Sequence, residues 1–295
     1  LSELSLERTR EEWSKLFLRA HRPSLGLQAA FDTGFFHYYL PAIAALAKTP
    51  QDPEHHPEGN CWVHTLLSVD QAKDVMAEGS WTTSEQLIIL LAVWAHDFGK
   101  ATTTQMVEGR VRALGHDRAG VVIANDFLRC AGFPSKVGDQ VIPLVREHMT
   151  PAQLFAHSHR GVVTDGAMRR LAQRLHPANI RLLAAVTEAD YRGRGPFPGT
   201  GIRVVWPRDN PAVSWLLERM AELQLQQRPA PVLWGRDLVS RGWPPGPMFG
   251  QALDAAERLA QSGWSREQII ALLAEPRSPA EDLQKLQRAA SELKP

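Results

Sequence analysis

The sequence has 295 residues, 44% of them hydrophobic, which is enough to bury a sizeable core and argues against a disordered chain. Its 33 basic and 32 acidic residues give a net charge of +1, which excludes a strong overall field toward nucleic acid or a membrane. Two cysteines outside any CxxC pair exclude a disulfide scaffold and indicate a cytoplasmic compartment. The longest apolar run, residues 87–95, is too short to span a bilayer, which takes about 20 residues.

Apolar residues recur three and four positions apart along most of the chain, a spacing typical of helices and not of strands. The sequence therefore predicts an all-α fold. Thr82 and Glu85 have the spacing of a capping box, and Gly132 and Gly193 each follow an expected helix end. The expected helices, in chain order, cover residues 5–20, 27–47, 62–78, 84–97, 117–131, 136–148, 167–176, 178–192, 211–227, 249–261, 265–274 and 278–292.

Two stretches rich in glycine and proline, residues 193–210 and 242–250, interrupt the helical pattern and are typical of loops. The first of them predicts a domain boundary. We expect an N-terminal helical segment at 1–50, a central domain at 51–205 and a smaller C-terminal helical domain at 206–295.

One apolar helix ends in the adjacent pair His96 and Asp97. A carboxylate buried there without a partner is strongly disfavoured, and a bound cation would remove that cost. His64 and Asp190 also lie in strongly apolar helical segments. Four ligands of mixed imidazole and carboxylate type suit a borderline transition metal better than calcium. The sequence therefore predicts a metal site made of these four residues.

His116, at a helix start, and His148, at a helix end, fit a second ion, with Asp97 bridging the two metals. Paired ions polarise a phosphoryl oxygen and activate water near neutral pH. A single helical histidine is more often an ordinary core or surface residue, so the hypothesis depends on all six residues together. His55 and His56, in the turn before the first ligand helix, are interpreted as residues of the pocket rim.

Three cations near these ligands are candidate substrate-binding residues: Lys100, Arg192 and Arg194. Lys100 follows the His-Asp pair by three residues and would reach a bound phosphate, and the two guanidinium groups would hold a substrate phosphate. Two alternatives stay open, a solvated lysine at a helix end and surface salt bridges for the arginines. Asp97 and Lys100 are the candidate catalytic residues.

His64, the pair His96-Asp97 and Asp190 resemble the ligand set of the HD-domain superfamily of metal-dependent phosphohydrolases. More narrowly, HHPEGNCWVHTLLSVD, WAHDFGKA, GHDRAG and ADYRGRG are similar to the HD region of bacterial tRNA nucleotidyltransferases, the CCA-adding enzymes. The resemblance implies an HD-domain helical bundle preceded by N-terminal helices, with residues 51–205 as the phosphohydrolase domain. The family's nucleotidyltransferase head has no counterpart in this sequence, so we do not expect this chain alone to add nucleotides.

The resemblance implies 2′,3′-cyclic phosphodiesterase, 2′-nucleotidase and phosphomonoesterase activity on nucleotides or RNA ends, with tRNA as a partner. It also implies one or two divalent ions, such as manganese, iron, nickel or magnesium. Arg192 and Arg194 match a motif of the CCA-adding enzymes, and the resemblance implies that this motif holds RNA. Two other hypotheses stay open: an RNA-binding body of a split tRNA-processing enzyme with a vestigial HD site, and a hydrolase of nucleoside polyphosphates such as dNTPs or ppGpp.

Overall fold

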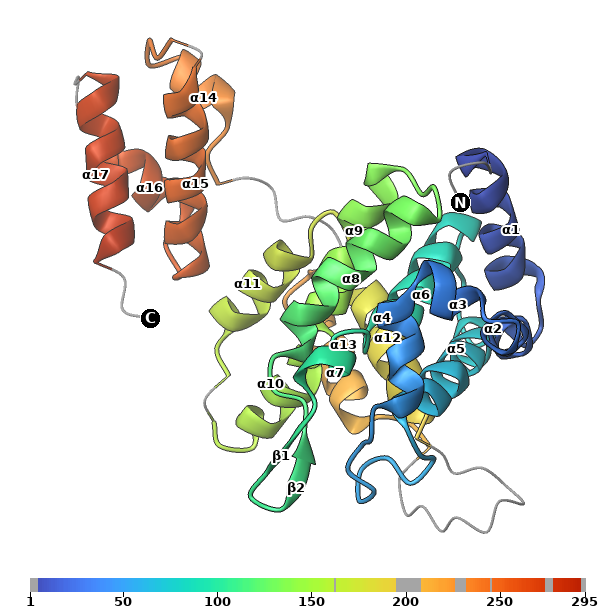
Figure 1. The fold of residues 1–295 in the computed structure, drawn as a ribbon. Coiled ribbons are helices and arrows are strands. Elements are labelled where there is room, and N and C mark those ends of the chain that lie inside the picture. Colours follow the sequence, from blue (N-terminus) through green and yellow to red (C-terminus); the bar gives the residue numbers. More distant parts are fainter. Residues whose placement is uncertain are drawn as a thin grey trace. The chain divides into compact units, whose positions relative to one another are not determined.

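The structure is a computed structural model, and it describes residues 5–161, 163–194, 208–225, 232–244, 246–273 and 278–292. Regular structure in these residues is nearly all helical, which confirms the all-α prediction (Figure 1). None of the described helices is long and apolar enough to cross a membrane. The elements in chain order are α1 (Leu6–Arg19), α2 (Pro23–Asp32), α3 (Phe35–Tyr39), α4 (Pro41–Ala44), the 3-10 helix η1 (Ala45–Lys48), α5 (Cys61–Ala77), α6 (Thr83–Ala95), α7 (Lys100–Thr103), β1 (Gln105–Val107), β2 (Arg110–Arg112), α8 (His116–Cys130), α9 (Ser135–Glu147), α10 (Thr150–Ser158), α11 (Asp165–Leu175), α12 (Ile180–Arg192), α13 (Pro211–Glu222), α14 (Gly235–Val239), α15 (Pro247–Gln261), α16 (Arg266–Leu272) and α17 (Pro279–Ser291).

Local chain chemistry explains where the expected helices are right and where one is wrong. The capping box is confirmed, since the Thr82 hydroxyl accepts from the Glu85 N–H and the Glu85 carboxylate accepts from the Thr82 N–H. The single helix expected at 27–47 is wrong. Gly34 adopts a left-handed φ of 80°, which ends the first helix, and Pro41 starts α4.

A hairpin and a helix next to the site were not expected from the sequence. Strands β1 and β2 form an antiparallel hairpin with Val107 opposite Arg110 and Gln105 opposite Arg112. Strands of three residues are too short for an alternating pattern to stand out. Helix α10 follows His148 after a single residue, because Pro151 is accommodated in its first turn.

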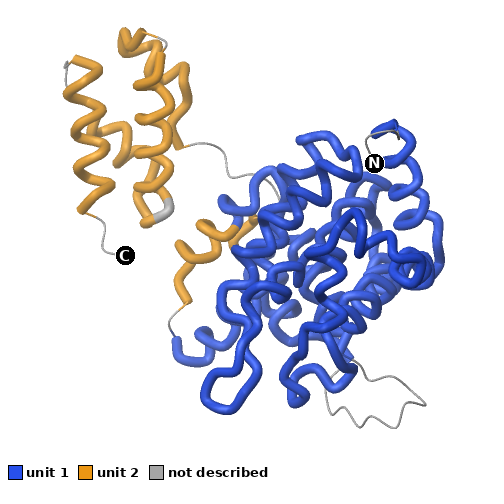
Figure 2. The backbone as a smooth tube through the Cα atoms, in the orientation of Figure 1, with its two compact units in different colours: residues 1–162, 172–222 blue, residues 163–171, 223–295 orange. Residues whose placement is uncertain are grey.

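The chain divides into two compact units, which are described separately (Figure 2). The first contains residues 1–162 and 172–222, and the second contains residues 163–171 and 223–295. Helix α13, expected at the start of the C-terminal domain, packs on α10 and α12 within the first unit. The predicted boundary after residue 205 lies outside the described residues, and the three-part division stays a prediction.

Helix α6 lies at the centre of the first unit and packs against α1, α5, α8, α9 and α12 (Figure 1). Its residues 88–95 are buried on every face, as expected for a helix that is apolar all round. Trp94 is fully buried among aromatic rings of four other elements, including Phe36 and Phe127. This packing fixes the end of α6, and therefore the pair His96 and Asp97 that follows it.

The second unit has a hydrophobic core of its own. Helices α14, α15, α16 and α17 surround this core. The long helices α15 and α17 pack directly on each other. Leu238, Ala256, Leu259 and Leu286 are fully buried there. None of the predicted site residues belongs to this unit.

Gly99 permits the close approach of the chain after α6 to helix α8. A Cβ atom at this position would overlap the carbonyl oxygen of His116 and the backbone nitrogen of Gly120. We expect Gly99→Ala to lower the free energy of unfolding by about 1–3 kcal/mol, because two backbone segments would have to separate. Denaturant unfolding of the purified variant would measure the change.

Gly138 in α9 provides the matched control. A Cβ there meets only the Leu128 side chain, at 3.8 Å, which is ordinary van der Waals contact. Gly138→Ala should therefore raise the free energy of unfolding by roughly 0.5–1 kcal/mol through helix propensity. Equal effects of the two alanines would contradict the close-approach explanation.

Candidate metal centre

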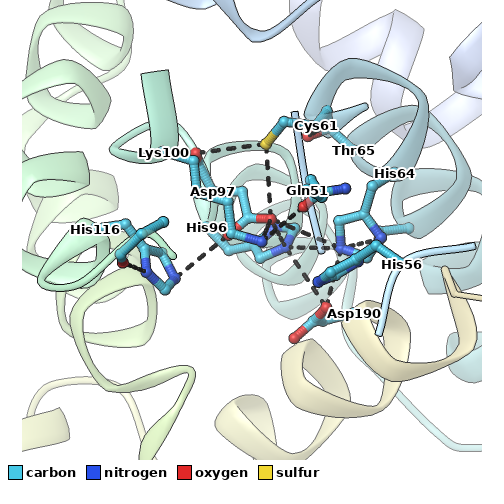
Figure 3. A network of polar contacts seen from close by, with 12 residues as sticks. Gln51, His56, Cys61, His64, Thr65, His96, Asp97, Lys100, His116 and Asp190 are labelled. Carbon is cyan, nitrogen blue, oxygen red and sulfur yellow. Dashed lines mark hydrogen bonds and ion pairs between the residues drawn. The ribbon is translucent and has the colours of Figure 1, made fainter. Parts of the chain in front are cut away.

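The structure brings all six predicted ligands together in the first unit. Figure 3 shows five of them, His64, His96, Asp97, His116 and Asp190. Each of the six is at most 8% exposed. Their positions are His64 in α5, His96 and Asp97 at the end of α6, His116 at the start of α8, His148 at the end of α9 and Asp190 in α12. Residues up to 126 positions apart in the chain are therefore neighbours in one buried cluster.

The first half of the cluster contains His64, His96, Asp97 and Asp190. The Nε2 atom of His64 lies 3.0 Å from Asp190 Oδ1 and 3.7 Å from Asp97 Oδ2. The Nε2 atom of His96 lies 3.3 Å from Asp97 Oδ2 and 3.7 Å from Asp190 Oδ1. Two imidazole nitrogens and two carboxylates thus face one point, which is a donor set suited to a divalent transition metal.

The second half contains Asp97, His116 and His148. The Nε2 atom of His116 lies 3.4 Å from Asp97 Oδ1 and 3.1 Å from the Nε2 atom of His148. Asp97 therefore directs Oδ2 toward the first half and Oδ1 toward the second. Ligand atoms within each of the sets His64–His96–Asp97 and Asp97–His116–His148 lie within 4.8 Å of one another. This arrangement is suited to two ions with Asp97 between them.

Backbone carbonyl groups set the orientation of three of the imidazole rings. The Nδ1 atoms of His96, His116 and His148 lie 2.6–2.7 Å from the carbonyl oxygens of the residues three positions earlier. A carbonyl oxygen only accepts, so each Nδ1 must carry the proton. In the neutral form of each ring, Nε2 is then an unprotonated lone pair directed into the cluster.

The contact between His116 and His148 tests whether these residues fit a metal. In their neutral forms with protonated Nδ1 atoms, the two rings would present two lone pairs to each other across 3.1 Å, and neither would have a proton to donate. A proton on His148 does not relieve the repulsion, because burial lowers the pKa of this ring to about 3. A cation between the rings would remove it, so the residues present fit a metal ion.

Nearby cations keep the buried carboxylates ionised. Burial alone would raise the pKa of Asp97, but His96 and Lys100 hold it well below its ordinary value. The pKa of Asp190 is likewise well below its ordinary value, because Arg194 and His64 outweigh the effect of burial. Both carboxylates are therefore negatively charged and ready to act as ligands.

Glu58 is a site residue that the sequence analysis missed. Its Oε1 atom accepts hydrogen bonds from Nδ1 of His64, at 2.7 Å, and from Nδ1 of His56, at 2.9 Å. These bonds outweigh burial and lower the pKa of Glu58 to about 2. Glu58 therefore orients His64 from outside the cluster, a common arrangement around metal-binding histidines. Its position six residues before His64, in the segment HHPEG, was the available signal.

The predicted substrate-binding cations differ in their surroundings. Lys100 is not a solvated lysine, since its Nζ atom lies 2.8 Å from both Asp97 Oδ2 and Gln51 Oε1, and its side chain is only 12% exposed. Arg194 lies 3.1 Å from Asp190 Oδ2 and so contacts the cluster. A substrate-binding role for these two residues stays a prediction.

For Arg192, the described contacts favour the salt bridge that was left open as the alternative. Its guanidinium group binds Glu78 and Asp209 at 2.8 Å and Glu188 at 2.7 Å. The side chain is 9% exposed, so these three carboxylates occupy its donors. Arg192 therefore ties the end of α12 to the end of α5, and its prediction as a substrate-binding residue gains no support from these contacts.

Comparison with known proteins relates two parts of the chain to RNA metabolism. The family described as the probable RNA and SrmB-binding site of polymerase A matches residues 1–46. The Multifunctional CCA protein of Acinetobacter baumannii strain AYE is 28% identical over 198 residues, which are 66% of this chain and 44% of that protein. The Multifunctional CCA protein of Cupriavidus metallidurans is 29% identical over 196 residues, 65% of this chain and 43% of that protein.

These similarities establish homology to the CCA-adding proteins and to an RNA-binding region of polymerase A. The matched region spans less than half of the length of either CCA relative. The chain therefore shares ancestry with part of the Multifunctional CCA proteins.

Proposed function

We propose that this chain binds RNA and that its His/Asp cluster hydrolyses phosphoesters at RNA ends or on nucleotides, as a 2′,3′-cyclic phosphodiesterase, 2′-nucleotidase or phosphomonoesterase. Homology to the CCA proteins and to an RNA-binding family supports the RNA partner more directly than it supports hydrolysis. The case for hydrolysis rests on one observation, the anchored Nε2 atoms of His116 and His148 that face each other at 3.1 Å beside Asp97.

The two halves of the cluster, joined by Asp97, would hold one divalent ion each. When bound, such ions polarise a phosphoryl oxygen and lower the pKa of water. Three further residues of the protein would bind the substrate or keep the ligands in the required state. Lys100 pairs with Asp97 and lines a cleft, where it would bind a phosphate oxygen of the substrate. Arg194 keeps Asp190 ionised, and Glu58 keeps the Nδ1 proton of His64 in place.

The proposal predicts a metal-dependent phosphoesterase. Purified protein loaded with manganese or nickel should contain bound metal by elemental analysis and should hydrolyse 2′,3′-cyclic nucleotides or p-nitrophenyl phosphate. Chelation should abolish that turnover, and restoring the metal should recover it, because the ligand set is complete without further residues. A metal-loaded sample that hydrolyses neither substrate would contradict the hydrolase assignment.

The second candidate is an RNA-binding helical body with a vestigial HD site, which the comparisons also favour. An electrophoretic mobility shift with tRNA that survives His96→Ala, in a protein without bound metal or turnover, would support it. Loss of tRNA binding altogether would contradict both candidates. A panel of dNTPs and ppGpp in the same assay would reveal a nucleoside polyphosphate hydrolase instead.

A further inference from the structure

A cleft of about 290 Å³ reaches the metal centre at His116 and Lys100. Its walls come from residues 50–56, from the connection between β2 and α8, and from the region of α10. Its volume is at the lower end of the range for small-ligand sites, about 300–1,000 Å³. All of these residues belong to the first compact unit.

Ion pairs made by Arg110 connect two of the cleft walls. Arg110 on β2 donates from Nε to Asp52 Oδ2 at 2.9 Å, and its guanidinium group also pairs with Glu54. The β1–β2 hairpin is thereby fixed to the loop at 52–54, so that Arg110 and both carboxylates are already paired within the protein. Arg110 is consequently a structural residue of the cleft.

Arg112 lies two residues further along β2, and alternate residues of a strand share a face, so it lies on the same face as Arg110. It lines the cleft and is exposed, and among the described residues it has no ion-pair partner. Lys100, the other strong cation of the cleft, is already paired with Asp97. Arg112 is thus a free guanidinium group four residues before His116, whose ring is anchored on the Ala113 carbonyl.

The remaining cleft lining suits a nucleotide. Leu114, which is 69% exposed, and Met149 provide apolar surface next to the cations. Two carboxylates line the cleft. The charge of Asp52 is neutralised by Arg110. Asp117 lies in the first turn of α8, where its negative charge interacts favourably with the helix dipole. A guanidinium group forms bidentate hydrogen bonds with phosphate oxygens, which an ammonium group cannot do.

We infer that the cleft binds the last two nucleotides of an RNA strand, with the terminal phosphate at the metal centre and Arg112 on the preceding backbone phosphate. This assignment rests on the proposed function and adds the substrate class and its specificity residue. A mononucleotide lacks the second phosphate and would not engage Arg112. The site would therefore prefer strand ends over free nucleotides.

The test compares a 2′,3′-cyclic mononucleotide with a dinucleotide that ends in a 2′,3′-cyclic phosphate. Arg112→Ala should lower kcat/KM about tenfold or more for the dinucleotide, the usual size of a lost hydrogen bond to a charged group, and should change it less than about twofold for the mononucleotide. Arg112→Lys should recover part of the loss. Arg129→Ala, at an exposed arginine of α8 outside the cleft, should leave both substrates unchanged.

Equilibrium binding by calorimetry separates this inference from the hydrolase assignment. The wild-type protein should bind a dinucleotide with a terminal 3′-phosphate more tightly than a 3′-mononucleotide, and Arg112→Ala should remove that preference, whether or not turnover occurs. A preference that survives Arg112→Ala would overturn the assignment. A larger effect of Arg112→Ala on nucleoside triphosphates than on the dinucleotide would also overturn it, in favour of polyphosphate substrates.

Discussion

Asp97→Asn should lower phosphoester hydrolysis at least about a hundredfold, since groups that only orient a metal ligand already contribute about 10–100-fold. Asp97 directs one oxygen at each half of the cluster, with Oδ2 at 3.3 Å from His96 and Oδ1 at 3.4 Å from His116. An amide is neutral and offers a single oxygen as a ligand, so it cannot bridge two cations. Steady-state kinetics and elemental analysis of the same sample would measure the effect.

The same substitution removes the charge that pairs with Lys100 inside the protein. Asp126→Asn is a suitable control, because Asp126 is an exposed carboxylate of α8 that pairs with Arg129 on the surface. It should retain both metal content and activity. If Asp97→Asn kept full activity and a normal metal content, the metal centre would have to lie elsewhere.

Four of the candidate ligands, His64, His96, Asp97 and Asp190, could be predicted from sequence because each is an ionisable residue in or at the end of an apolar helix. Helix periodicity shows that His64 and Asp190 lie in buried helices, and a buried charged group requires a partner. That reasoning needs no knowledge of tertiary structure. It says nothing of which carbonyl group anchors each ring, and therefore could not show that the Nε2 atoms of His116 and His148 face each other at 3.1 Å.

Residues whose role depends on a distant partner were less predictable. Arg192 and Arg194 are equivalent in the sequence, but one binds three structural carboxylates and the other contacts Asp190. Arg110 and Arg112 differ in the same way, because only Arg110 meets the loop at 52–54. Short-range signals also failed at Gly34, where one left-handed residue divides an apolar stretch that otherwise has helical periodicity.

Glu58→Gln is expected to weaken metal binding about 10–100-fold while preserving the fold. The negatively charged carboxylate accepts from the Nδ1 atoms of both His64 and His56. Burial would lower the pKa of His64, but the hydrogen bonds to Asp190 and to Glu58 raise it. Glutamine keeps the shape but removes that charge, which makes His64 a weaker ligand. It also puts an NH2 donor at or near the position of Oε2, which is buried and has no hydrogen-bond partner.

Competition with a chelator of known affinity would measure metal binding of Glu58→Gln, and circular dichroism would verify its fold. Glu54→Gln is the matched control, because Glu54 lies in the same loop but is 67% exposed and pairs with Arg110 instead of a ligand. The control should bind metal normally. Unchanged metal affinity in Glu58→Gln would mean that the backbone of α5 alone orients His64, and Glu58 would then have no part in the metal centre.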